Sequence, residues 1–272
     1  MNELLGNPAF QSSVAPFLAG LVVAGALFAV RLGGLAAAAG LFATVYLVGD
    51  FTLESLDSKR KLVLVAMAAP VLGAIADLAF KPTRATGPVL GVLFAGAGYW
   101  VFMNLLQQKP RFELALYGAG LAAFMIWNVA ATLALQADGL RAGAAGLGFG
   151  LGSGVGAVLG ASALLGQYGM GLGAGCGAFL LIAMILGPRA VPGTALTLTA
   201  SVAASLVATG AMLTGQFPWY ALAALALVPA MVRLPLPAAA PWIQGIVAAL
   251  YAAAAAVAAW VLAWLASRGS AG

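Results

Sequence analysis

Long apolar segments, separated by short polar connections, dominate the chain. Each segment has about 17–25 residues, which is enough for an α-helix to cross the hydrocarbon layer of about 30 Å. The segments lack the regular alternation of polar and apolar positions that a membrane β-strand shows. The pattern therefore predicts about ten transmembrane helices. These cover residues 14–30, 33–50, 62–80, 88–107, 113–136, 143–165, 168–187, 194–214, 218–232 and 240–266.

The connections between these segments are too short to contain a soluble domain. The longest charged connection is Asp50–Lys61. We expect it to lie at the level of the lipid headgroups, either as a solvated loop or docked to a partner protein or anionic lipid. Residues 1–272 are thus predicted to form a single transmembrane domain, an all-α polytopic helix bundle without a soluble domain.

Composition supports this interpretation. Apolar residues make up 64% of the 272 residues, charged residues make up 7%, and the mean hydropathy is +1.07. Soluble domains carry about 25% charged residues, and disordered chains are polar, so both classes are excluded. The formal net charge is +5, but the cations are scattered between apolar segments. That distribution is typical of membrane-protein loops and predicts no nucleic-acid partner.

Residues with catalytic or metal-binding chemistry are scarce. The chain has no histidine, one cysteine and seven acidic residues, none of which follows Asp138. We therefore expect no catalytic residues, no metal site, no cofactor and no enzymatic activity. Cys176 stands in a Gly-Cys-Gly sequence inside an apolar segment. It is expected to be a small buried side chain instead of a reactive thiol.

Glycines recur every two or four residues between residues 146 and 177. Glycines four apart lie on one face of a membrane helix and let a neighbouring backbone approach closely. We expect two glycine ridges to pack segments 143–165 and 168–187 against each other. One ridge is Gly148, Gly152, Gly156 and Gly160, and the other is Gly169, Gly173 and Gly177. The alternative is a broken helix or re-entrant segment whose backbone lines a substrate path, which would give nine crossings.

Asp77 is the one acid expected well inside an apolar segment. An intramembrane carboxylate is a candidate for proton or cation coupling. Lys81 follows one helical turn later, so an Asp77–Lys81 ion pair at the membrane surface is the structural alternative. Pro70 lies in the same segment and removes a backbone hydrogen bond, which predicts a kink. Asp77 and Pro70 therefore mark a candidate moving or substrate-facing helix.

A second polar position lies near the centre of segment 113–136. Trp127 and Asn128 are followed by Thr132, one helical turn beyond Asn128. An amide inside the hydrocarbon layer requires a hydrogen-bond partner. Asn128 is therefore expected either to bond to another helix or to face a polar cavity, and Trp127 and Thr132 are assigned to the same candidate substrate path.

These features favour a small transporter or permease for a neutral or weakly polar solute. The alternative is a non-catalytic subunit or assembly factor of a larger membrane complex. In either case the expected location is a bacterial inner (cytoplasmic) membrane, and the expected partners are lipids and possible further membrane subunits or copies of the chain. Lys and Arg divide evenly between the two sides for ten crossings, so the orientation stays open.

Overall fold

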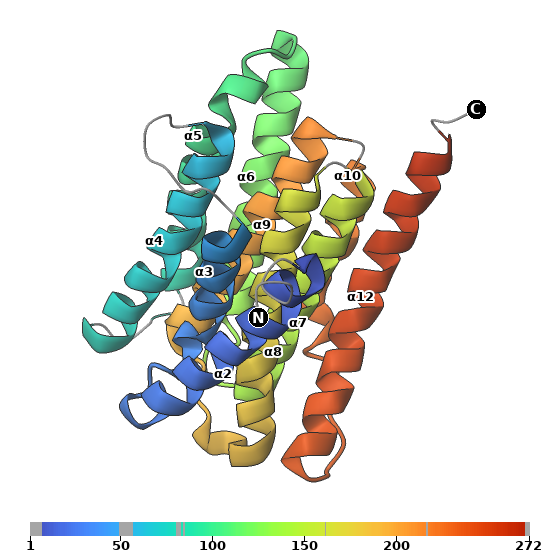
Figure 1. The fold of residues 1–272 in the computed structure, drawn as a ribbon. Coiled ribbons are helices and arrows are strands. Elements are labelled where there is room, and N and C mark those ends of the chain that lie inside the picture. The colour runs from blue at the N-terminus through green and yellow to red at the C-terminus, as the bar shows by residue number, and fades with distance from the viewer. Residues whose placement is uncertain are drawn as a thin grey trace.

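The computed structural model describes residues 7–48, 57–79, 83, 85–160, 162–215 and 217–269. The described residues form helices and turns, with no strand among them. Figure 1 shows the long helices side by side in one bundle, with α12 along an edge. The elements are η1 (Phe10–Val14), α2 (Ala15–Leu27), η2 (Phe28–Val30), η3 (Gly33–Leu35), α3 (Ala36–Val48), α4 (Ser58–Ala79), α5 (Thr86–Leu106), α6 (Arg111–Leu133), α7 (Gly139–Gly160), α8 (Ala163–Leu186), η4 (Gly187–Arg189), α9 (Gly193–Thr214), α10 (Trp219–Ala226), α11 (Val228–Met231) and α12 (Pro241–Gly269).

Eight helical segments in the described part of the chain are long and apolar enough to cross a membrane. They are Phe10–Val30, Ser58–Ala79, Thr86–Leu106, Arg111–Leu133, Gly139–Gly160, Ala163–Arg189, Gly193–Thr214 and Pro241–Arg268. Two further apolar helices, Gly33–Val48 and Trp219–Met231, are shorter. At a rise of 1.5 Å per residue they extend about 24 Å and about 20 Å, less than the hydrocarbon thickness. The prediction of a helical membrane bundle is confirmed, and the count of ten crossings stays a prediction.

The central helix of the bundle is α9. It contacts α3, α4, α5, α6, α7 and α8, and 89% of its most apolar 18-residue window is buried. Its sequence contains only small, aliphatic and hydroxyl-bearing side chains apart from Met212, and no charged residue. A helix that is apolar all round is suited to a buried position.

The glycine-rich region forms two continuous helices, α7 and α8, each long enough to cross a membrane. The alternative of a broken or re-entrant segment is therefore wrong for this region. Glycine lowers intrinsic helix stability by up to about 1 kcal/mol per residue, but it allows backbones to approach closely enough for dispersion contacts that side chains would prevent.

The contact between α7 and α8 uses a different row of α7 glycines from the one expected. A Cβ added to Gly154 would lie 2.6 Å from the backbone nitrogen of Met170, and a Cβ added to Gly169 would lie 2.5 Å from Gly154 Cα. Gly150 and Gly173 meet in the same way. Gly169 and Gly173 thus face α7 as expected, whereas Gly177 has only the Leu147 side chain nearby, at 3.4 Å.

The expected ridge on α7 faces other elements, which corrects the pairing predicted from the sequence. A Cβ on Gly148 would lie 2.7 Å from Ala252 Cβ of α12, and one on Gly152 would lie 3.2 Å from Ala256 Cβ. Gly156 and Gly160 face Phe217. The physical reason is that glycines two residues apart point about 200° apart on a helix. One row of α7 therefore contacts α8, while the other contacts α12 and Phe217.

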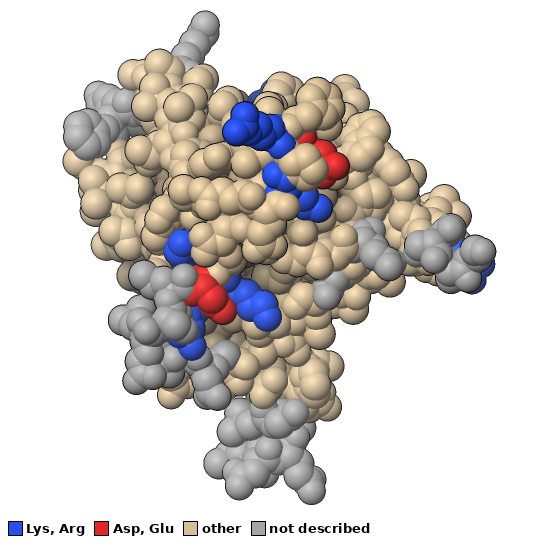
Figure 2. All heavy atoms as spheres, turned by 90° about the horizontal axis from the view of Figure 1, so that it is seen from above, with Lys and Arg blue, Asp and Glu red and all other residues tan. Residues whose placement is uncertain are grey.

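Successive long helices run in opposite directions, so each end of the bundle gathers alternate helix ends. We call these the α9 N-terminal end and the α9 C-terminal end. Figure 2 views the α9 C-terminal end, where Lys and Arg side chains gather in groups with acidic side chains beside them. The Nζ atom of Lys61 lies 4.8 Å from the centroid of the Trp100 ring, and Arg268 Cζ lies 3.8 Å from that of Trp264. Such cation–aromatic pairs are typical of the headgroup level of a membrane.

Candidate functional site

Hydroxyl side chains follow one side of α9 through the middle of the bundle. Thr194, Ser201, Ser205 and Thr209 are separated by seven, four and four residues, which places them on one face of a helix. All four are at most 1% exposed. Ser201 satisfies its own hydroxyl by donating to the carbonyl of Thr197 at 2.7 Å, a common arrangement for hydroxyls inside membrane helices.

Polar side chains of α6 and of the turn after it lie against this face. The Nδ2 atom of Asn128 donates to Ser205 Oγ at 3.0 Å, and Thr194 Oγ1 donates to Gln136 Oε1 at 3.2 Å. Thr132 lies between Asn128 and Gln136, four residues from each. We call Asn128, Thr132, Gln136, Thr194, Ser201, Ser205 and Thr209 the polar seam. It joins segments that are far apart in the sequence into one line of hydrogen-bonding groups.

Three atoms of the polar seam have no hydrogen-bond partner. They are Asn128 Oδ1, Thr132 Oγ1 and Thr209 Oγ1. The side chains of Asn128 and Thr132 are 0% exposed, and that of Thr209 is 1% exposed. An unpaired buried polar group costs about 1–3 kcal/mol, so three in one helix contact are unfavourable for a seam that only holds helices together. They are available to a hydrogen-bonding molecule within the bundle.

Asp77 holds one end of α9. Its Oδ1 accepts a hydrogen bond from the backbone N–H of Thr194 at 2.7 Å, and its Oδ2 accepts one from Ala195 N–H at 3.0 Å. These N–H groups belong to the first turn of α9, where no carbonyl of the helix can accept from them. A carboxylate is also favoured there by the helix dipole. Asp77 of α4 therefore caps α9.

Gly193 makes this cap possible. Its φ is +65°, in the left-handed region that favours glycine. A Cβ at this position would overlap the carboxylate of Asp77. The sequence Pro192-Gly193-Thr194 thus turns the chain into α9 and leaves room for the carboxylate.

A cavity of about 320 Å³ lies near the seam at the α9 N-terminal end. It is lined by α5 and α6 and the segments that flank them, with Thr83, Thr86 and Gln136 supplying polar groups. Gln136 belongs to both this cavity and the polar seam. The described part of its lining carries no charged side chain.

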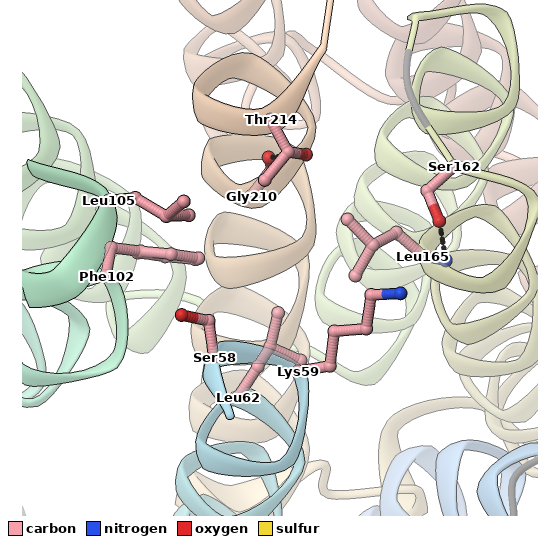
Figure 3. A pocket seen from close by; sticks show the side chains of 9 residues that line it. All are labelled: Ser58, Lys59, Leu62, Phe102, Leu105, Ser162, Leu165, Gly210 and Thr214. Carbon is pink, nitrogen blue, oxygen red and sulfur yellow. Dashed lines mark hydrogen bonds between the residues drawn. The ribbon is translucent and has the colours of Figure 1, made fainter. Parts of the chain in front are cut away.

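A second cavity, of about 180 Å³, lies at the α9 C-terminal end. Figure 3 shows side chains from α4, α5 and α9, and from the start of α8, around it. Lys59 extends across it toward Ser162 and Leu165, and Gly210 lies on its α9 wall, directly after Thr209. Within the described residues Lys59 has no ion pair or hydrogen bond. The two cavities thus flank the polar seam.

The structure brings together only some of the residues predicted for a substrate path. Asn128 and Thr132 lie in the polar seam, and Asp77 contacts α9 at Thr194, about 16 Å along the helix axis from Ser205. Asp77 and Asn128 share no described cavity. Lys81 lies outside the described residues, so the Asp77–Lys81 pair stays a prediction.

Trp127 and Pro70 do not belong to the seam. Trp127 is 48% exposed, and its Nε1 donates to the carbonyl of Ala226 at 2.8 Å, which ties α6 to the junction of α10 and α11. This placement corrects its assignment to the substrate path. Pro70 is buried within α4, which continues as one helix from Ser58 to Ala79, and it lines none of the described cavities.

Several seam and cavity residues were missed in the sequence. Ser205, Thr209, Gln136 and Lys59 were not singled out, although the spacing of hydroxyls in residues 194–209 is a signal for a polar helix face. Cys176 is buried as expected, 0% exposed, beside Gly146 in the α7–α8 contact. Among the described residues no cluster of His, Cys, Asp or Glu could hold a metal ion. The chain matches no family model, no curated protein and no solved structure.

Proposed function

We propose that the protein is a small transporter or permease that carries a neutral, hydrogen-bonding solute across a bacterial inner membrane along the polar seam. The observation that supports this proposal is the set of unpaired atoms Asn128 Oδ1, Thr132 Oγ1 and Thr209 Oγ1 between two cavities. A solute that donates to the amide oxygen and exchanges hydrogen bonds with the hydroxyls would satisfy all three.

The charge distribution favours a neutral solute. No seam residue is charged, and an ion inside the hydrocarbon layer requires a counter-charge or a water-filled path. The nearest carboxylate described, Asp77, already accepts two backbone hydrogen bonds. A solute with hydroxyl or amide groups matches this chemistry better than a cation or an anion.

The burial of the seam means that transport requires movement. Asn128 and Ser205 are at most 1% exposed, so the conformation described is closed between its two cavities. Separating α6 from α9 at either end would extend one cavity toward Asn128. The Asn128–Ser205 hydrogen bond, at 3.0 Å, is then the contact that a passing solute exchanges for its own.

Solute flux into proteoliposomes tests this proposal. Glycerol, urea and erythritol serve as neutral probes and potassium chloride as the charged comparison, with shrinkage and reswelling followed by light scattering. We expect Thr132→Val and Thr209→Val each to lower neutral-solute flux by about fivefold, corresponding to one lost hydrogen bond of about 1 kcal/mol. Stability should be unchanged or higher, because each substitution removes a buried hydroxyl that has no protein partner.

Thr199→Val is the matched control. Thr199 lies on another face of α9 and donates to the carbonyl of Ala195 at 2.6 Å, so its loss should leave the flux unchanged. Equal effects of all three substitutions would refute the seam as the path. Flux no greater than in empty liposomes for every neutral probe would refute the transporter and favour the alternative, a non-catalytic subunit of a larger membrane complex.

A further inference from the structure

An apolar groove lies on the outside of the bundle between α6 and α10. Its volume is about 530 Å³. The residues that line it include Leu116, Gly120 and Phe124 of α6 and Trp219 and Leu222 of α10. Leu116 and Phe124 are eight residues apart, so the groove follows α6 for about 12 Å. It lies away from the polar seam, and the inference below is independent of the proposed function.

Two features of the sequence create this groove. The α10 helix has only eight residues, so it covers just part of the length of α6. Gly120 has no side chain, and a Cβ added to it would find no atom within 4 Å. Trp219 at the edge is 69% exposed and Leu116 is 60% exposed. The groove is therefore open toward the hydrocarbon layer.

Basic side chains lie just above the groove at the headgroup level. Lys109 and Arg111 precede the groove residues of α6, and Lys109 Nζ lies 5.7 Å from the ring centroid of Tyr117, which also lines the groove. Glu113 is the acid of this first helical turn. Within the described part of the chain, neither Lys109 nor Arg111 forms an ion pair.

We infer that this groove binds one anionic phospholipid, with the headgroup phosphate at Lys109 and Arg111 and one acyl chain along Gly120. The apolar lining matches an acyl chain, and the two cations match an anionic headgroup at the same end. A transmembrane helix of a partner protein would cover the groove without engaging the cations. The combination of groove and cations therefore selects the lipid.

Native mass spectrometry of the intact protein in detergent tests the site by titration with phosphatidylglycerol and with phosphatidylcholine. Both acyl and headgroup contacts are expected to contribute, so phosphatidylglycerol should bind more tightly. Lys109→Gln and Arg111→Gln should each weaken phosphatidylglycerol binding about fivefold and leave phosphatidylcholine binding unchanged. Lys61→Gln is the matched control, because Lys61 lies at the same end of the bundle over the Trp100 ring and lines no described cavity.

Gly120→Phe fills the groove and should abolish the tight binding of both lipids. Gly96→Phe is its control, because a Cβ on Gly96 also finds no atom within 4 Å and Gly96 lines no described cavity. Equal binding of the two lipids, or an equal loss in the Lys61→Gln variant, would overturn the anionic site. Unchanged lipid binding in Gly120→Phe would overturn the groove as the acyl site and leave it as a surface for a partner helix.

Discussion

Replacing Gly154 by alanine should separate α7 from α8. The added Cβ would lie 2.6 Å from the Met170 nitrogen, 2.9 Å from the Gly166 oxygen and 3.0 Å from the Gly169 carbonyl carbon. All three are backbone atoms, so no side-chain rotation can make room. Because carbon contacts are most favourable at about 3.5–4.0 Å, the helices must move apart by about 1 Å at this point.

The expected cost follows from that displacement. A gap of 0.5–1 Å forfeits about a quarter to a half of each dispersion contact, and overpacking of a tight core typically costs about 1–3 kcal/mol. We expect the upper part of that range, about 3 kcal/mol, because the backbone cannot yield locally. The better helix propensity of alanine returns up to about 1 kcal/mol. The net loss should be about 2 kcal/mol, or about 4–8 °C in melting temperature.

Cys176 provides the assay for this loss. It is the only cysteine of the chain, is 0% exposed, and lies beside Gly146 in the α7–α8 contact. A thiol-reactive fluorophore should therefore label the purified protein only when this contact opens on heating. Gly96→Ala is the control, because its Cβ meets no atom within 4 Å and its melting temperature should be unchanged or slightly higher. Equal melting temperatures for Gly154→Ala and Gly96→Ala would refute the backbone contact.

Two further predictions concern the cap of α9, and the same thermal assay measures both. Asp77→Asn should lower stability by about 1–2 kcal/mol, because a neutral amide can accept the Thr194 and Ala195 N–H groups less well than a carboxylate does. If Asp77 also couples transport, flux in the folded variant should lose its dependence on a proton gradient, and unchanged dependence would reject that role. Gly193→Ala should cost about 1–2 kcal/mol, since alanine is strained at a φ of +65° and its Cβ overlaps Asp77. Its cost and that of Asp77→Ala should be clearly less than additive, and full additivity would contradict direct contact between the two residues.

The sequence located the apolar helices well but not their lengths. Segment 33–50 begins with the 3-10 turn Gly33–Leu35 before α3, and segment 218–232 divides into α10 and α11 next to Pro229. Hydropathy measures how apolar a run is and carries little information on whether the backbone continues as one straight helix. The count of residues that can cross the membrane was therefore overestimated for these two segments.

Partners far apart in the chain could not be predicted from local spacing. Four-residue periodicity identified the glycine faces of α7, yet it could not assign Gly152 to α12 instead of α8. Asp77 suggested a partner one turn away at Lys81, whereas the described partners of its carboxylate are backbone groups of Thr194 and Ala195, more than a hundred positions later. Asn128 was correctly expected to need a hydrogen-bond partner, and only the fold identifies it as Ser205.

The two glycine faces of α7 also constrain how the protein can be assembled during synthesis. The α8 helix follows α7 directly, so one face can be covered as soon as α8 enters the bilayer. The partner of the other face, α12, begins at Pro241, roughly 80 residues after α7 ends at Gly160. At typical translation rates that face stays open to lipid for about 4–16 s. During this interval a bare row of glycines is accessible to any other small-residue helix in the membrane, so faithful assembly depends on α8 and α9 holding α7 in place until α12 arrives.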